Sequence, residues 1–174
     1  MNLNVDLFYF INNDLANPLF DAVMPYLTNC GGFVTLLAVC VLAVLIFRYY
    51  KKERYLEIAK LCLYALIVSG VIAACLKLLY QSPRPFTVLE NVRQLTIPSE
   101  PNSFPSGHAS STFSVVSVLV WILKENLAIV LLLVMFALLI AFSRVYIGVH
   151  YPFDVLVGAL VGVISGAVIL KWKS

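Results

Sequence analysis

The sequence predicts an all-α integral membrane protein, a bundle of five or six transmembrane helices with short N-terminal helices at the membrane interface. Hydrophobic residues make up 61% of the 174 residues, and the mean hydropathy is +0.94, whereas soluble domains are nearer half apolar. The apolar residues lie in long runs, which is typical of helices solvated by lipid. The length fits one domain covering residues 1–174.

The first 30 residues predict short helices rather than one clear span. Two apolar stretches, 5–11 and 18–27, are separated by the polar residues 12–14 and by Asn17-Pro18. Asn17 is expected to cap a helix whose first residue is Pro18. We expect these helices to lie at the interface or to insert partly, and a sixth span in this region stays open. No cleavable signal peptide is expected, because this start carries acidic and no basic residues.

Five later segments predict helices that cross the membrane. Each has a charge-free centre of about 15–18 residues, and its flanks can complete the ~20 residues that a span needs. The segments are 31–50, 56–80, 106–123, 126–147 and 152–171. Between the second and third lies the one long polar loop, 81–105, whose five prolines argue against a helix there.

Basic residues predict the orientation in the membrane. With five spans, one face carries Arg48, Lys51, Lys52, Arg54, Lys124, Lys171 and Lys173. The positive-inside rule makes that face cytoplasmic. The long loop and the acidic N-terminal segment are then extracytoplasmic, in an inner or plasma membrane.

Other ionisable residues near the span ends all fall on the opposite, extracytoplasmic face. Alone, a lysine or arginine would snorkel to the headgroups, a histidine would anchor at the interface, and Asp154 would cap a helix. Both histidines of the chain are in the set, however, and polar groups at this depth are costly. Their gathering at one level predicts a functional site, made from Lys77, Arg84, His108, Ser143, Arg144, His150 and Asp154.

Three cations of this set predict an anion site. Lys77, Arg84 and Arg144 would attract a multiply charged anion and repel metal ions. Ser106-Gly107 precedes His108 at the start of the third long helix, where free N–H groups and a close backbone approach favour phosphate. The site is therefore expected to hold phosphate, with neither metal nor cofactor.

The two histidines predict the reactivity. His150 and Asp154 are four residues apart, so a carboxylate could bond one ring nitrogen and leave the other free to attack phosphorus. Pro152 leaves open whether His150 lies just before the regular helix. His108 would donate a proton to the leaving oxygen and then activate water for hydrolysis of a phosphohistidine.

Small residues predict close helix packing. Gly158, Gly162 and Gly166 continue the four-residue spacing from Asp154, and Ser110, Ser114 and Ser117 lie on the third long helix. We expect both sets to serve packing rather than catalysis. The four cysteines, Cys30, Cys40, Cys62 and Cys75, are expected to be small buried hydrophobes.

These residues resemble the three signature motifs of the type 2 phosphatidic acid phosphatase (PAP2) superfamily. All three are complete and in order over residues 77–154. They are Lys77-x6-Arg84-Pro85, Pro105-Ser106-Gly107-His108 and Ser143-Arg144-x5-His150-x3-Asp154.

The resemblance implies metal-independent hydrolysis of a phosphate ester or pyrophosphate on a lipid, with His150 as nucleophile, Asp154 as its partner and His108 as acid and base. It implies phosphate binding by Lys77, Arg84, Ser106, Gly107 and Arg144. Small bacterial-type members act on undecaprenyl diphosphate, phosphatidylglycerol phosphate or the 1-phosphate of lipid A, and the sequence does not choose among them. Vanadium haloperoxidases also belong to the superfamily, but they are larger and soluble.

Three other classes compete with this interpretation. A transporter or channel would place charges along a path through several helices, whereas these gather at one face. A metal-dependent membrane hydrolase would use His108, His150 and Asp154 as ligands, next to three cations that disfavour a metal. A structural membrane protein leaves both histidines unexplained. We expect a bilayer and a lipid phosphate as partners, no nucleic acid, and an oligomeric state that the sequence leaves open.

Overall fold

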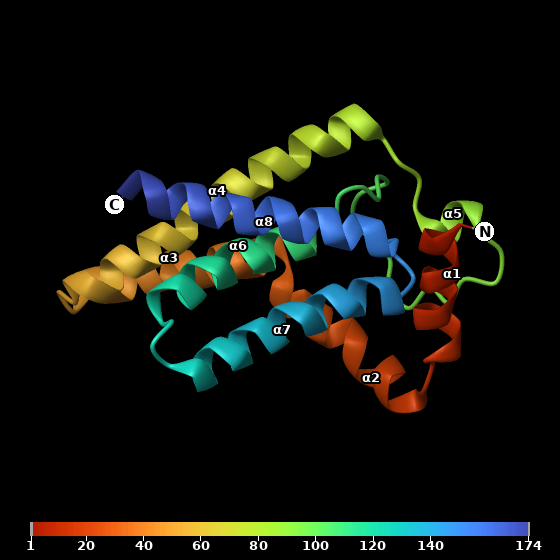
Figure 1. Ribbon diagram of the computed structural model, residues 1–174, viewed down its shortest axis with the longest axis horizontal. Helices are drawn as coiled ribbons and strands as arrows, with labels where there is room; N and C mark the ends of the chain where they lie inside the picture. The colour runs from red at the N-terminus through yellow and green to blue at the C-terminus, as the bar shows by residue number, and fades with distance from the viewer. Residues whose placement is uncertain (1, 174) are drawn as a thin grey trace.

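The computed structural model describes residues 2–173, and within that range it is built from helices without a strand (Figure 1). The five long segments expected from hydropathy are all helical, with ends close to the predicted ones. They are α3 (Phe33–Tyr49), α4 (Glu53–Tyr80), α6 (Gly107–Ile122), α7 (Leu127–Tyr146) and α8 (Pro152–Lys173).

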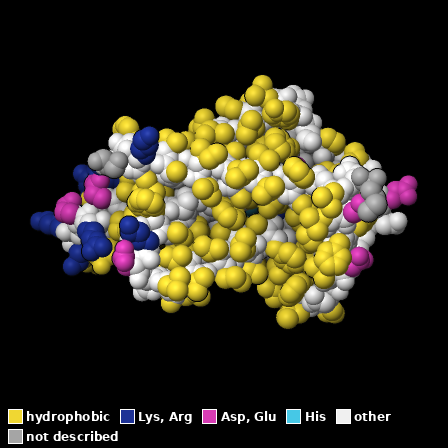
Figure 2. All heavy atoms as spheres, viewed as in Figure 1, with side chains coloured by type: hydrophobic (Ala, Val, Ile, Leu, Met, Phe, Trp, Pro, Cys, Tyr) yellow, Lys and Arg dark blue, Asp and Glu magenta, His cyan; other side chains and the backbone are white. Residues whose placement is uncertain are grey.

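The helices have the length and composition of an integral membrane protein. In residues 2–173, three stretches are long and apolar enough to cross a bilayer: 53–88, α7 and α8. A fourth span is possible by these criteria if the region 18–31 and α3, which meet at a bend of 51°, count as one. At 16 residues, α6 rises only about 24 Å, less than the ~30 Å hydrocarbon core. Figure 2 shows a hydrophobic band between two charged ends, with lysine and arginine at one of them.

The N-terminal region forms four short helical segments. These are α1 (Leu3–Tyr9), the π-helical η1 (Phe10–Asp14), α2 (Pro18–Leu27) and the 3₁₀ turn η2 (Thr28–Gly31). The predicted cap is confirmed: Asn17 precedes α2, and its side-chain oxygen accepts a hydrogen bond from the Phe20 amide at 2.9 Å. In Figure 1, α1 and α2 lie at the end of the bundle opposite the C-terminus.

A polar network ties this N-terminal region to the long loop and to α7. Arg93 of the loop pairs with Asp21 of α2 at 2.5 Å and donates to the backbone oxygen of Asn12. Tyr146 of α7 donates to the same Asp21 carboxylate at 2.6 Å. The hydrogen bond to Asp21 raises the pKa of Arg93. The fully buried Asn12 donates to the Tyr146 carbonyl, so three distant segments are locked together.

The expectation that loop 81–105 contains no helix is wrong at one point. Residues Pro85–Val88 form the single helical turn α5. Proline at the first position needs no hydrogen bond from its missing N–H, so Pro85 starts the turn rather than preventing it. The turn follows Arg84 directly and fixes where that side chain enters the bundle.

Helix α6 is the central helix, in contact with α3, α4, α7 and α8. The predicted small-residue stripe is confirmed as packing. A Cβ atom added at Gly158, Gly162 or Gly166 would lie within 2.5 Å of an α6 atom or the Ser106 cap that precedes the helix. The hydroxyl of Ser110 donates to the backbone of Ser69 in α4. Close packing thus joins the start of α6 to the start of α8.

Gly162→Ala is expected to destabilise the protein. The added methyl would lie 2.5 Å from the Ser110 carbonyl oxygen and 2.8 Å from the Phe113 Cβ, so α6 and α8 would have to separate. Overpacking typically costs about 1–3 kcal/mol, and here it opposes alanine's better helix propensity. Thermal unfolding in detergent should show a lower melting temperature, whereas Val163→Ala on the exposed side of α8 should change it little. An unchanged melting temperature for Gly162→Ala would contradict the close packing.

The prediction that all four cysteines are buried is correct for two of them. Cys40 and Cys62 are buried and belong to one apolar cluster between α3, α4, α6 and α8. Cys30 and Cys75 are exposed instead, because their positions on η2 and α4 turn away from the bundle core.

Candidate active site

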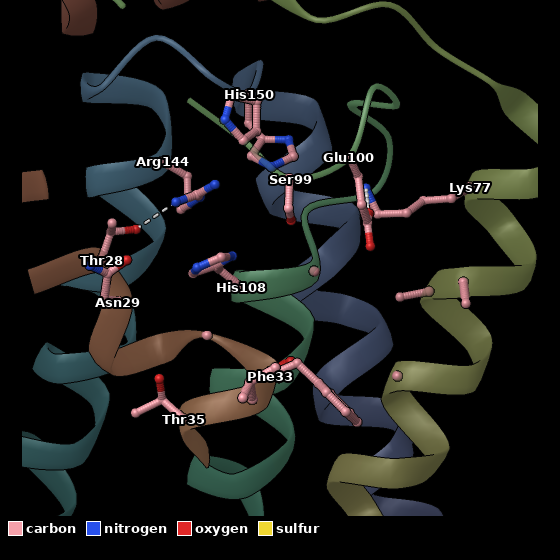
Figure 3. Close-up of a pocket in the computed structure, with 18 of the residues that line it drawn as sticks. Thr28, Asn29, Phe33, Thr35, Lys77, Ser99, Glu100, His108, Arg144 and His150 are labelled. Atoms are coloured by element: carbon pink, nitrogen blue, oxygen red, sulfur yellow. Dashed lines mark hydrogen bonds and ion pairs between the residues drawn. The ribbon is translucent and has the colours of Figure 1, made fainter. Parts of the chain in front are cut away.

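A cavity of about 750 Å³ lies at one end of the bundle, where η2, α3, α4, α6 and α7 meet the long loop. Six of the residues singled out in the sequence line it, although they come from five different segments. Figure 3 shows the side chains of His108, Arg144 and His150 directed toward this shared space, with Lys77 on its far side. The six are Lys77, Arg84, Gly107, His108, Arg144 and His150.

Arg84 is held rigidly from behind. Its side chain is 3% exposed, and its Nε donates to the Glu100 carbonyl while Nη1 donates to the Val149 carbonyl, both at 2.8 Å. The same Nη1 lies 3.3 Å from Nε2 of His150. The guanidinium is therefore fixed against the histidine before any ligand arrives.

Arg144 has unused hydrogen-bonding capacity. Its side chain is 5% exposed, and Nη1 donates to the Thr28 hydroxyl at 2.8 Å, the contact drawn in Figure 3. Its Nε is one of two buried side-chain polar atoms in residues 2–173 that have no hydrogen-bond partner. A buried charged donor without a partner is costly, so this position is suited to a bound anion.

Lys77 makes a different kind of contact. Its Nζ donates to the Asn102 carbonyl at 2.8 Å and pairs with the Glu100 carboxylate at 3.3 Å. The Glu100 side chain is more than half exposed, so this ion pair sits at the cavity rim. A carboxylate thus lies where an anionic ligand would meet Lys77.

His150 lies between α7 and α8 and is 2% exposed. Its Nδ1 is 3.5 Å from Oδ2 of Asp154, in the first turn of α8. The hydroxyl of Ser103 contacts both groups, 3.3 Å from Nδ1 and 2.5 Å from the same carboxylate oxygen. Burial lowers the pKa of His150, and the nearby guanidiniums of Arg144 and Arg84 lower it further. Both effects favour the neutral ring, which has a lone pair on one nitrogen.

The start of α6 forms one wall of the cavity. The buried Ser106 caps the helix, its hydroxyl accepting from the Ala109 amide, and its own amide donates to the Asp154 carbonyl. A Cβ atom built at Gly107 would meet no atom within 4 Å, so open space adjoins the helix N-terminus. His108 lines that space, whereas Ser106 lies behind it.

Several residues of the site were missed in the sequence. Thr28, Asn29 and Gly32 reach the cavity from η2 and the residue after it, although the N-terminal 30 residues lie outside the motifs. No hydropathy signal distinguishes them. Ser103, two residues before Pro105, was one polar residue among many in the loop. Ser143, in contrast, donates to the Ile140 carbonyl of its own helix and does not line the cavity.

The side chains around the cavity can be compared with the ligands that a metal ion needs. Within the described residues 2–173, no three His, Cys, Asp or Glu side chains come close enough together to form a candidate metal site. Three cationic side chains, Arg84, Arg144 and Lys77, line the cavity together with the two histidines.

A helical membrane bundle with a buried cationic pocket and two histidines at one end defines a class, the membrane-embedded phosphatases. The model of the PAP2 superfamily matches residues 58–174, more than half of the chain. The chain belongs to this superfamily, and the resemblance drawn from the three motifs is confirmed.

Relatives and a solved structure cover nearly the whole chain. The chain is 31% identical to the Bacitracin transport permease protein BcrC of Bacillus licheniformis, over 99% of this chain and 81% of that protein. It is 31% identical to Undecaprenyl-diphosphatase BcrC of Bacillus subtilis, over 98% of this chain and 84% of that protein. The crystal structure of Aquifex aeolicus LpxE has 35% sequence identity and a TM-score of 0.84, covering 98% of this chain and 96% of the other.

Proposed function

We propose that this membrane phosphatase hydrolyses a phosphate monoester or pyrophosphate on a lipid through a phosphohistidine on His150. One observation carries the proposal: a single cavity joins the buried cations and histidines to an apolar wall. That wall comes from α3 and α4 and includes Val34, Ile67 and Val71, which are exposed on the molecule's surface. The charged headgroup of a lipid would contact the cations and histidines, and the first carbons of its tail would contact the apolar wall.

The first step transfers phosphoryl from the lipid to the enzyme. Nε2 of His150 attacks phosphorus, and the bond from phosphorus to the leaving oxygen breaks. His108 donates a proton to that oxygen, and the negative charge of the substrate favours the protonated imidazole that this requires. Arg84, Arg144 and Lys77, with the open amides at Gly107, stabilise charge on the three equatorial oxygens.

The second step releases phosphate. His108, now neutral, removes a proton from a water molecule, whose oxygen attacks phosphorus. The bond from phosphorus to Nε2 breaks, and its electron pair returns to the ring of His150. Inorganic phosphate leaves, and the enzyme recovers both histidines in their starting protonation states.

Undecaprenyl diphosphate is the first substrate to test. The Bacillus subtilis relative carries that activity in its name and matches the chain almost from end to end. Phosphatidylglycerol phosphate, the 1-phosphate of lipid A and phosphatidic acid share the same chemistry and complete the panel.

We also propose five spans, formed by α3, α4, α6, α7 and α8, with the cavity on the extracytoplasmic face. The turn 50–52 with Lys51 and Lys52, the turn 123–126 with Lys124, and the C-terminal end of α8 lie opposite the starts of α6 and α8, which adjoin the cavity (Figure 1). At this basic end, Lys173 pairs with Glu57 at 3.0 Å. The positive-inside rule then directs the cavity away from the cytoplasm.

The proposal is tested with purified protein in detergent, by phosphate release from the four lipids with EDTA present. We expect release from at least one lipid at a rate that EDTA leaves unchanged. Loss of activity with EDTA, restored by a divalent metal, would replace this mechanism with a metal-dependent one. No release from any lipid would reopen transport, the activity named for the Bacillus licheniformis relative.

A further inference from the structure

We propose that Ser103 is a positioning residue, which links His150 to Asp154 and selects the ring nitrogen that attacks. This inference rests on the proposed function, because it assigns a role within the same site. Ser103 is fully buried, and its amide donates to the Ser82 carbonyl at 2.8 Å, which fixes the backbone of the loop at the serine.

The distances favour an indirect link between the histidine and the carboxylate. The direct separation from Nδ1 of His150 to Oδ2 of Asp154 is 3.5 Å, long for a hydrogen bond. The Ser103 hydroxyl is closer to both groups, at 3.3 Å and 2.5 Å. The carboxylate oxygen also accepts from the Tyr151 amide at 2.9 Å, so its orientation is fixed independently.

Arg84 and Asp154 stand at the two ends of a series of hydrogen bonds that runs through His150 and Ser103, and they determine the direction of each bond in it. A guanidinium can only donate, so Nε2 of His150, 3.3 Å from Nη1 of Arg84, must be the acceptor nitrogen. The proton of the neutral ring then lies on Nδ1, which donates to the Ser103 oxygen. An ionised carboxylate can only accept, so the Ser103 hydroxyl donates its hydrogen bond to Asp154. Nε2 therefore carries the lone pair of the ring, which must leave its contact with Arg84 to attack phosphorus.

The same loop connects this link to the cavity rim. Three residues before Ser103, Glu100 pairs with Lys77, and its carbonyl accepts from Nε of Arg84; Asn102 also accepts from Lys77. One short segment, 100–103, therefore contacts two of the phosphate-binding cations and the nucleophile's partner. Removing the hydrogen-bond partner of a metal-ligating side chain typically changes affinity or activity by about 10–100-fold, and we expect a comparable effect for the partner of a nucleophile.

The test compares Ser103→Ala with Ser165→Ala, a buried serine of α8 whose hydroxyl donates to the Val161 carbonyl of its own helix. We expect Ser103→Ala to lower kcat by about 10–100-fold with little change in KM. The acidic limb of its kcat/KM profile should move to lower pH, because protonated His150 loses a stabilising partner. Ser165→Ala should keep wild-type kinetics, and Ser103→Thr, which keeps the hydroxyl, should recover most of the rate.

A double-mutant cycle separates this role from a merely structural one. If the serine acts through the carboxylate, Ser103→Ala should cost much less in an Asp154→Asn background than in the wild type. Additive losses, or a kcat within twofold of wild type for Ser103→Ala, would overturn the proposal. The cycle distinguishes the two roles even if Ser103→Ala also lowers the melting temperature, because the wild type, the two single variants and the double variant are compared at a temperature where all four are folded. Failure of the proposed function itself would appear differently, as an inactive wild type.

Discussion

Replacing His150 with alanine is expected to lower phosphate release by roughly 10⁴-fold or more, the largest effect of any substitution in the chain. The alanine has no nitrogen to attack phosphorus, and the remaining cations can bind the substrate without opening a two-step path. The side chain is 2% exposed and lies in the turn that joins α7 to α8. Phosphate release from the most active lipid, with EDTA present, measures the loss.

A second measurement shows whether the missing group is the nucleophile. With a lipid labelled at the transferred phosphate, acid-labile, base-stable label should remain on the quenched wild-type protein and be absent from His150→Ala. The melting temperatures of both proteins establish that the variant is folded. Full activity in the folded variant would exclude His150 as the nucleophile and return the metal-dependent mechanism to first place.

Replacing Arg144 with methionine is expected to lower kcat/KM by about 10²–10³-fold without lowering stability. The buried guanidinium has an unpaired Nε and is aimed into the cavity, so it can contribute a hydrogen bond to phosphoryl oxygens. A methionine removes a buried charge that costs stability in the empty protein. Activity and stability should therefore change in opposite directions, which is the signature of a binding group rather than a packing group.

Inorganic phosphate provides an independent readout of the same substitution. It should raise the melting temperature of the wild type, because it binds only the folded state, and have little effect on Arg144→Met. Arg48→Met, at the exposed basic end of α3, is the matched control and should keep both the activity and the shift with phosphate. An Arg144→Met protein that still responds to phosphate like the wild type would remove Arg144 from the anion site.

The long helices and the level of the site could be predicted from the sequence because both depend on local physics. A run of apolar residues in lipid must satisfy its own backbone hydrogen bonds, so hydropathy alone predicts helices. Polar residues in such runs are rare enough that Lys77, His108 and Arg144 are conspicuous. The spacing of His150 and Asp154 by one helical turn likewise brought the two residues together, even though His150 lies just before α8.

The sequence alone therefore determined an all-helical membrane protein, six of the residues that line its cavity and the family to which it belongs. Tertiary structure decided how those residues contact one another: that Thr28 holds Arg144, that Glu100 meets Lys77, and that Ser103 contacts both His150 and Asp154. These contacts join residues from 23 positions apart (Lys77 and Glu100) to 116 positions apart (Thr28 and Arg144) in the chain. Periodicity describes only the neighbours within one helix, so contacts of this kind become visible only when the helices pack.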